Sequence, residues 1–257
     1  MNDLFRLDGR TAFVSGAAGH LGRAMTEALC DAGAHVILNG RDDTKLATYE
    51  SELRSRGHSV ARAAFDVADM VAVRAFFSKL PRLDVLVNNA VSMTSKPFAQ
   101  LESADFETTY ASSVTAAFES VRAERTALAA SGGASVVNIA SMYASVAPDA
   151  RIYAKPEQQS PFHYGPAKAA LIQLTRHLAA ELGRDNIRVN ALVPGPFPRD
   201  DVTRSDPEFA ARLAAKTILG RTGQAGEIAG PLLFLATRAS SFVTGAAITV
   251  DGGWTAW

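Results

Sequence analysis

The sequence predicts an α/β protein, built as one doubly wound parallel β-sheet with helices on both faces. Short apolar runs rich in β-branched residues alternate with longer stretches of helical periodicity along all 257 residues. The central runs are apolar almost throughout, which is typical of parallel strands that helices cover on both sides. Because strand–helix–strand crossovers are right-handed, one continuous sheet is the simplest arrangement.

The predicted elements follow one another without a break in pattern. The candidate strands are Thr11–Ser15, His35–Asn39, Ser59–Phe65, Asp84–Asn89, Ser135–Ala140, Ile187–Val193 and Ala246–Val250. Helices are expected near residues 20–32, 43–57, 69–80, 101–130, 162–183 and 225–237. Since no linker or repeat is visible, we expect a single domain over residues 1–257, with an extended irregular loop at about 142–163.

Composition limits the classes of partner. The chain is 47% hydrophobic and 20% charged with a formal net charge of +0, as expected for a globular protein with a large core. The balanced charge gives no reason to expect nucleic acid or an anionic membrane as a partner. No stretch has the ~18 apolar residues of a membrane span, and the first ten residues lack the apolar run that is typical of a signal peptide. With Cys30 as the single cysteine, we expect a soluble cytoplasmic protein.

The first predicted strand leads into a glycine-rich turn, "SGAAGHLG", and then into a predicted helix. Gly16, Gly19 and Gly22 are spaced three apart, and glycines let a backbone approach a pyrophosphate bound at a helix N-terminus. The turn therefore predicts a dinucleotide site of the Rossmann type, with His20 and Leu21 taking part. A turn that merely connects two elements is the alternative interpretation.

The end of the second predicted strand indicates which dinucleotide binds. An acidic residue there favours NAD, whereas a nearby arginine accommodates the 2′-phosphate of NADP. The chain reads "ILNGRDD", with Gly40 at the expected acidic position and Arg41 directly after it. NADP is therefore predicted in preference to NAD, with Arg41 as a solvated surface residue being the alternative.

Three polar residues predict chemistry at the carboxyl edge of the sheet. Ser141 follows the predicted strand "SVVNIA", while Tyr164 and Lys168 are four residues apart on a predicted helix and share one face. A neighbouring ammonium brings the pKa of a phenol, ordinarily about 10, toward the range in which it exchanges protons. The pattern suits general acid–base chemistry, and unrelated surface residues are the alternative.

Together these segments resemble the short-chain dehydrogenases/reductases over nearly the whole chain. The resemblance rests on the glycine turn, the set Ser141, Tyr164 and Lys168, and the segments Asp66–Val67, Asn88–Ala90, Arg188–Gly195 and Val243–Gly253. It implies hydride transfer between a nicotinamide and a small carbonyl or alcohol substrate, and the sequence indicates no metal site.

The resemblance also implies roles for individual residues. Tyr164 is the expected general acid/base, Lys168 lowers its pKa and binds the nicotinamide ribose, and Ser141 holds the substrate oxygen. The expected cofactor-binding residues are Ser15, Gly16, Gly19, His20, Leu21, Gly22, Arg41, Asp66, Val67, Asn88, Ala90, Tyr164, Lys168, Pro194 and Gly195. For Asn88, an asparagine that caps a strand end is the alternative.

The chain departs from the family pattern at several positions. His20 replaces the middle glycine of the usual turn, where a side chain can block the backbone or resist a positive φ. Ser113 stands where the family often has an asparagine that relays protons to Lys168. Val91 and Arg199 replace residues expected near the nicotinamide. We expect a turn of altered geometry, a doubtful role for Ser113 and a reshaped pocket.

The predicted loop at about 142–163 lies on the substrate side, because its two ends carry catalytic residues. We hypothesise that Arg151 and His163, with Arg199, recognise an anionic or polyhydroxylated substrate such as a sugar acid. A solvated loop or subunit contact is the alternative. The start of the chain and "VILNGRD" are similar to the gluconate 5-dehydrogenase group of the family.

Two other functions stay open at this point. One is a nucleotide-binding regulatory or scaffold protein with little catalysis, and the other is a 3-oxoacyl-thioester reductase. Because the family usually forms tetramers, a homotetramer or homodimer is expected, with the predicted helix at 101–130 and the tail "GGWTAW" as candidate contacts. Trp254 and Trp257 are expected to be buried in an interface or against the pocket, with a tail that folds back on its own subunit as the alternative.

Overall fold

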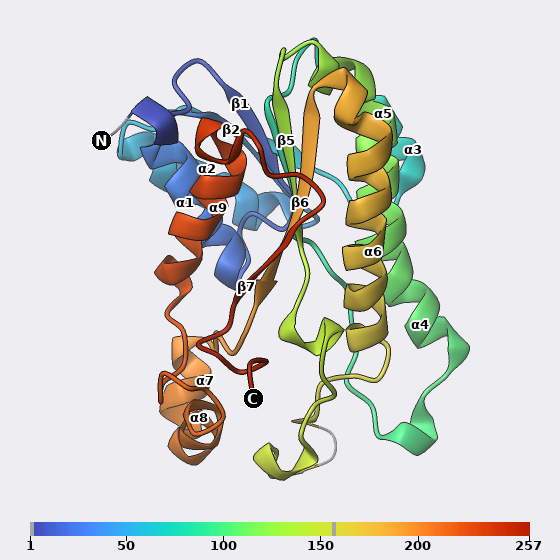
Figure 1. Ribbon diagram of the computed structural model, residues 1–257, viewed down its shortest axis with the longest axis vertical. Coiled ribbons are helices and arrows are strands. Elements are labelled where there is room, and N and C mark those ends of the chain that lie inside the picture. Colours follow the sequence, from blue (N-terminus) through green and yellow to red (C-terminus); the bar gives the residue numbers. More distant parts are fainter. Residues whose placement is uncertain (1–2, 156–157) are drawn as a thin grey trace.

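The computed structural model describes residues 3–155 and 158–257 (Figure 1). Parallel strands form one sheet in the order β3-β2-β1-β4-β5-β6-β7, which confirms the predicted doubly wound fold. The strand order reverses between β1 and β4, where such sheets bind ligands. The strands are β1 (Thr11–Val14), β2 (His35–Gly40), β3 (Val60–Ala64), β4 (Val85–Asn88), β5 (Ala134–Ile139), β6 (Ile187–Pro194) and β7 (Ala247–Val250).

Helices cover both faces of the sheet (Figure 1). One layer consists of α1 (His20–Asp31), α2 (Asp43–Ser55) and α9 (Ala229–Ala236). The opposite layer consists of α3 (Met70–Phe77), α5 (Ala116–Ala129) and α6 (Tyr164–Leu182). The lower half of Figure 1 holds α4 (Ser103–Tyr110), α7 (Asp200–Ser205) and α8 (Pro207–Ala214).

The strands supply side chains to both layers because successive residues face opposite sides. On β1, Ala12 and Val14 belong to the core cluster that includes α1, α2 and α9, whereas Phe13 belongs to the cluster with α3, α5 and α6. The rings of Phe13 and Phe77 meet edge to face at 4.9 Å. A slip of one residue would exchange these side chains between cores, so burial fixes the register and the positions of the strand ends.

The helix predicted over 101–130 is interrupted. A π-helical segment, Ala111–Thr115, separates α4 from α5. Its hydroxyl groups provide a reason, because Ser112 Oγ donates to the Thr108 carbonyl and Ser113 Oγ donates to the Thr109 carbonyl, each at 2.9 Å. Such side-chain donors compete with helical amides for the same carbonyl oxygens. The interruption lies beside the candidate site, as π-bulges often do.

The helices α7 and α8 were not predicted, although a local signal for α8 is present. Asp206 accepts a hydrogen bond from the Phe209 amide at 2.8 Å, and Pro207 occupies the first turn. An aspartate cap followed by proline is a typical helix start.

The stretch at 142–163 contains short 3₁₀ segments, and apolar contacts hold its first half against the rest of the chain. Positions 156–157 lie outside the described residues. Met142 and Ile152 pack with Trp254 in a small apolar cluster, so the tail folds back on its own chain at this point. Trp257 is 75% exposed, and its indole donates to the Lys216 carbonyl at 3.2 Å.

Over the ranges 3–155 and 158–257, no helix has the length and apolarity to span a membrane.

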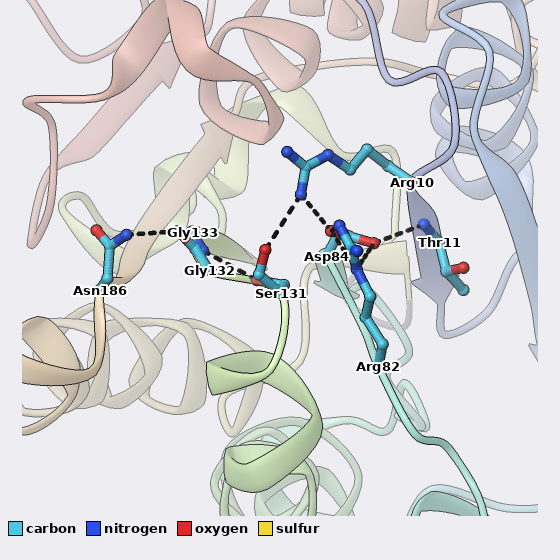
Figure 2. A network of polar contacts seen from close by, with 8 residues as sticks. All are labelled: Arg10, Thr11, Arg82, Asp84, Ser131, Gly132, Gly133 and Asn186. Carbon is cyan, nitrogen blue, oxygen red and sulfur yellow. Dashed lines mark hydrogen bonds and ion pairs between the residues drawn. The ribbon is translucent and has the colours of Figure 1, made fainter.

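A buried carboxylate ties the amino ends of the strands together (Figure 2). Asp84 accepts hydrogen bonds from Arg10 and from Arg82, both at 2.7 Å, and from the Thr11 amide at 2.9 Å. The Asp84 side chain is 3% exposed. Asp84 directly precedes β4, and its carboxylate therefore links the start of β4 to the start of β1. This edge of the sheet lies opposite the strand ends that form the site.

Candidate active site

A cleft of about 680 Å³ opens at the carboxyl ends of the strands. Ligand sites for small molecules commonly have volumes of about 300–1,000 Å³. Its wall runs from the turn after β1, past the ends of β2 and β3, to the start of α6 and the turn after β6. The predicted site residues that line it are Gly16, Gly19, His20, Leu21, Gly22, Arg41, Asp66, Val67, Ala90, Ser141, Tyr164, Lys168, Pro194, Gly195 and Arg199.

The glycine turn closes tightly around its own backbone. Gly16 has a φ of +64°, in the left-handed region that favours glycine. A Cβ atom on Gly22 would lie 2.1 Å from the Gly16 carbonyl oxygen, so α1 can begin this close to the turn only with glycine there. The result is a cradle of backbone at a helix N-terminus, which fits a dinucleotide pyrophosphate.

Ser15 holds this turn against the end of β4 and does not itself line the cleft. Its Oγ accepts hydrogen bonds from the amides of Asn89 at 2.9 Å and Ala90 at 3.0 Å. The Asn89 side chain returns a hydrogen bond to the Ser15 carbonyl at 2.9 Å. The role of Ser15 is therefore to position the two cleft-lining segments.

Asn88, predicted to bind the cofactor, is not among the residues that line the cleft. Its side chain is buried and donates to Oδ1 of Asn138, its registered partner on β5, at 2.9 Å. The adjacent Asn89 lines the cleft instead. The alternative interpretation of Asn88, a structural asparagine at a strand end, agrees with this geometry.

His20 does not distort the turn, which corrects the expectation of altered geometry. It is the first residue of α1, and the only non-glycine residue with positive φ in the described ranges is Asn186. The family's glycine at this position can therefore be replaced without backbone strain. The His20 imidazole lines the cleft, and its Nε2 atom is shielded from solvent with no hydrogen-bond partner among the described residues.

Arg41 and Asp66 face each other across the end of the cleft. Nη1 of Arg41 lies 3.7 Å from Oδ2 of Asp66, and the side chains are 67% and 41% exposed. An ion pair this long and exposed is weak, so the guanidinium can turn toward an anionic ligand. Gly40 contributes no carboxylate beside it, which leaves room for a ribose phosphate.

The three candidate catalytic residues meet at the other end of the cleft. Ser141 follows β5, Tyr164 opens α6, and Lys168 lies one helical turn later. Nζ of Lys168 donates to the Ile139 carbonyl at 2.7 Å and lies 5.6 Å from the centre of the Tyr164 ring. The carbonyl group at the end of β5 therefore holds the Lys168 ammonium close to the Tyr164 ring.

Burial is the main influence on the pKa values of Tyr164 and Lys168. It raises the pKa of Tyr164, and a hydrogen bond with Ser141 opposes part of that increase. Burial also lowers the pKa of Lys168 to about 8. Tyr164 keeps its proton at neutral pH, as an acid in carbonyl reduction requires.

Ser113 does not face the cleft. Its Oγ donates to the Thr109 carbonyl at 2.9 Å within the helix, whereas the neighbouring Ser112 lines the cleft. The doubt about a relay through Ser113 therefore agrees with the geometry.

Of the three residues predicted to contact the substrate, only Arg199 lines the cleft. Arg199 lies at the cleft wall and pairs with Asp201 at 2.8 Å. Arg151 is 84% exposed and pairs with Asp149 at 2.7 Å, away from the cleft lining. His163 is 0% exposed and is buried behind the wall.

Sequence reasoning missed several residues that line the cleft. Most of these residues end a strand or directly follow one, and a position at a strand end is a signal that could have identified them. Ser112 faces the cleft from the π-helical segment, which was not predicted. The missed residues are Asn39, Phe65, Asn89, Ser92, Met93, Ser112, Ile139, Ala140 and Phe197.

Comparison with known proteins agrees with this geometry. A family model described as enoyl-(acyl carrier protein) reductase matches residues 16–255. The chain belongs to the short-chain dehydrogenase/reductase family. As a short-chain dehydrogenase/reductase, it is an oxidoreductase.

Relatives of this short-chain dehydrogenase include enzymes named for gluconate and galactitol. Gluconate 5-dehydrogenase of Gluconobacter oxydans is 34% identical, with 98% of this chain and 96% of the relative covered. Galactitol 2-dehydrogenase (L-tagatose-forming) of Cereibacter sphaeroides is 36% identical, with coverages of 99% and 98%. A crystal structure of gluconate 5-dehydrogenase from Burkholderia cenocepacia, in complex with NADP and tartrate, superposes with a TM-score of 0.87 at 32% identity, covering 99% and 98% of the two chains.

Proposed function

We propose that this short-chain dehydrogenase transfers a hydride between NADP and a secondary alcohol or ketone of a sugar acid or polyol. The observation that carries the proposal is the joint placement of Ser141, Tyr164 and Lys168 at one end of a cleft whose other end is the glycine turn. A scaffold protein would not need this set of side chains around one cleft.

The residues of the cleft fit NADP and divide the chemistry between them. The glycine turn would hold the pyrophosphate, Arg41 the 2′-phosphate and Asp66 the adenosine end. When bound, NADP would supply the acceptor for the hydride of the alcohol carbon. Tyr164 donates its phenolic proton to the oxygen when a carbonyl is reduced, and only its deprotonated form takes the hydroxyl proton when an alcohol is oxidised. Ser141 orients the substrate oxygen, and Lys168 holds the nicotinamide ribose.

The substrate class is supported by the relatives and by one side chain. Two of the relatives are named for gluconate and galactitol, and one structure contains tartrate, a hydroxylated dicarboxylate. Arg199 brings a guanidinium to the cleft wall, where a substrate carboxylate can bind it in bidentate fashion.

The proposal is tested by a substrate panel. Purified enzyme with NADP⁺ is assayed against hexonates, galactitol and simple hydrophobic alcohols, and with NADPH against a 3-oxoacyl thioester. We expect oxidation of a hexonate or polyol. Turnover restricted to hydrophobic alcohols, or to the thioester, would reject the assigned substrate class.

Arg199→Gln is expected to raise KM for a hexonate by about tenfold or more, because a charge-assisted hydrogen bond contributes roughly 1.5–3 kcal/mol. KM for the uncharged galactitol should change little, and kcat should be retained for both. Steady-state kinetics measure these values, with Arg151→Gln as the matched control. Equal effects on hexonate and galactitol would exclude a carboxylate contact.

Arg41→Ala is expected to weaken NADPH binding by about ten- to hundredfold and to leave NADH binding nearly unchanged, since only NADPH has the 2′-phosphate. Titration with each nucleotide, followed by protein-to-nicotinamide energy transfer, measures both affinities. Arg62→Ala serves as the control, because that arginine lies on β3 outside the cleft lining. Equal weakening of both nucleotides would contradict the assignment.

We also infer a cytoplasmic homo-oligomer. The single cysteine, Cys30, is buried and suits a reducing compartment. Phe118 on α5 is 42% exposed and Phe242 is 103% exposed, which favours coverage by a second subunit. Light scattering on purified protein tests the oligomeric state, and a monomer at micromolar concentration would reject it.

A further inference from the structure

His163 is fully buried beside Tyr164, and both of its ring nitrogens are engaged. The residue is 0% exposed and forms the cap position before α6. Nδ1 lies 2.8 Å from Oγ1 of Thr109 on α4, and Nε2 lies 3.2 Å from the carbonyl oxygen of Thr94. One side chain therefore connects the start of α6, the end of α4 and the segment after β4.

The segment after β4 forms part of the cleft wall. Ser92 and Met93 line the cleft. The Ser92 carbonyl accepts a hydrogen bond from Thr109 Oγ1 at 2.9 Å, and the Ser92 amide donates to Ser112 Oγ at 2.9 Å. Thr109 is thus the intermediate between the buried imidazole and the wall.

The available protons fix how this network can be arranged. Nε2 faces a carbonyl oxygen, which only accepts, so Nε2 carries a proton. Thr109 has one hydroxyl proton for two acceptors, the Ser92 carbonyl and Nδ1 of a neutral His163. A neutral ring therefore leaves one acceptor without this donor. In a cationic ring Nδ1–H donates to Thr109, whose own proton is then free for Ser92.

Charged groups also surround the ring. Asp105 on α4 binds Nζ of Lys96 at 2.8 Å. Hydrogen bonds from Lys96 and from the Glu102 amide hold the pKa of Asp105 below its usual value. Phe106 packs edge to face against the imidazole at 5.7 Å. Asp105 favours a cationic His163, Lys96 opposes it, and Tyr164 is the adjacent residue in the chain.

We propose that His163 is a positioning residue whose protonation turns the Thr109 hydroxyl toward Ser92, coupling the cleft wall to the start of α6 that presents Tyr164. This assignment replaces the predicted substrate contact. Its effect on turnover rests on the proposed function, whereas the coupling itself does not.

The coupling is tested by NMR titration of the protein, whose 257 residues include five histidines. With labelled imidazoles, we expect the Ser92 and Met93 amides to shift with the same midpoint as the His163 ring. Thr109→Val should abolish the response of these amides, while Thr108→Val, on the exposed side of α4, should preserve it. A ring that stays in one state, or wall amides that do not follow it, would overturn the proposal.

Kinetics provide a second readout. In His163→Asn, kcat for the best substrate of the panel should fall by about ten- to hundredfold, as misplacement of a catalytic group does. NADPH affinity should be retained, and the pH dependence of kcat should change. A folded variant with wild-type kcat and pH profile contradicts the proposal. If no panel substrate turns over, the proposed function fails while the NMR titration still decides the coupling.

Discussion

Tyr164→Phe is expected to lower kcat by about 10²–10⁴-fold, the usual contribution of a positioned general acid or base. Phenylalanine keeps the ring that packs at the start of α6 and removes only the hydroxyl. Burial holds the pKa of Tyr164 above its ordinary value, so the wild-type residue carries the proton that a developing alkoxide requires. Initial rates of ketone reduction with NADPH, together with nucleotide titration, measure the change.

The control for Tyr164→Phe is Tyr153→Phe. Tyr153 also lies partly buried near the site, where its hydroxyl is 2.8 Å from that of Tyr143, but it does not line the cleft. This variant should keep kcat near the wild-type value, and both variants should retain NADPH affinity. If Tyr164→Phe kept most of its turnover, another group would have to supply the proton.

The fold could be predicted from the sequence because its strands are short apolar runs whose period and order leave few arrangements. The sheet edge that carries Ser141 and the glycine turn followed from the same reasoning, since parallel strands end at a common edge. On the predicted helix that carries Tyr164 and Lys168, the four-residue spacing was enough to place both side chains on one face.

Features that depend on tertiary hydrogen bonds could not be predicted in this way. The side chains of Asn88 and Asn89 differ in direction because Asn88 pairs with Asn138 across the sheet. The π segment that turns Ser112 toward the cleft depends on hydroxyl groups that compete with helical amides for the same carbonyl oxygens. The periodicity of apolar residues carries no information about this competition. His163 was expected at the substrate because it adjoins Tyr164, but its partners come from segments remote in sequence.

Asp84→Ala is expected to lower the free energy of unfolding by about 2–4 kcal/mol, because removal of a buried charge partner leaves donors unpaired. For a chain of this size, such a loss lowers Tm by roughly 5–15 °C. The donors left unpaired are Arg10, Arg82 and the Thr11 amide (Figure 2). Thermal denaturation with and without the substitution measures the difference, and Asp84→Asn, which keeps one carbonyl acceptor, should fall between the two.

The contribution of Asp84 should also depend on pH with a defined sign. Burial by itself raises the pKa of Asp84, but hydrogen bonds from Arg82, Thr11 and Arg10 outweigh it and hold the pKa below the ordinary value. A folded-state pKa below the unfolded value of about 3.9 means that the carboxylate stabilises the fold above that pH. The stability difference between wild type and Asp84→Ala should therefore be full at pH 7 and diminish as the pH falls below about 4. Asp8→Ala, at an ion pair whose carboxylate is 64% exposed, should leave Tm unchanged at neutral pH. A difference for Asp84→Ala that persisted in acid would show that packing, rather than the ionised carboxylate, stabilises this edge of the sheet.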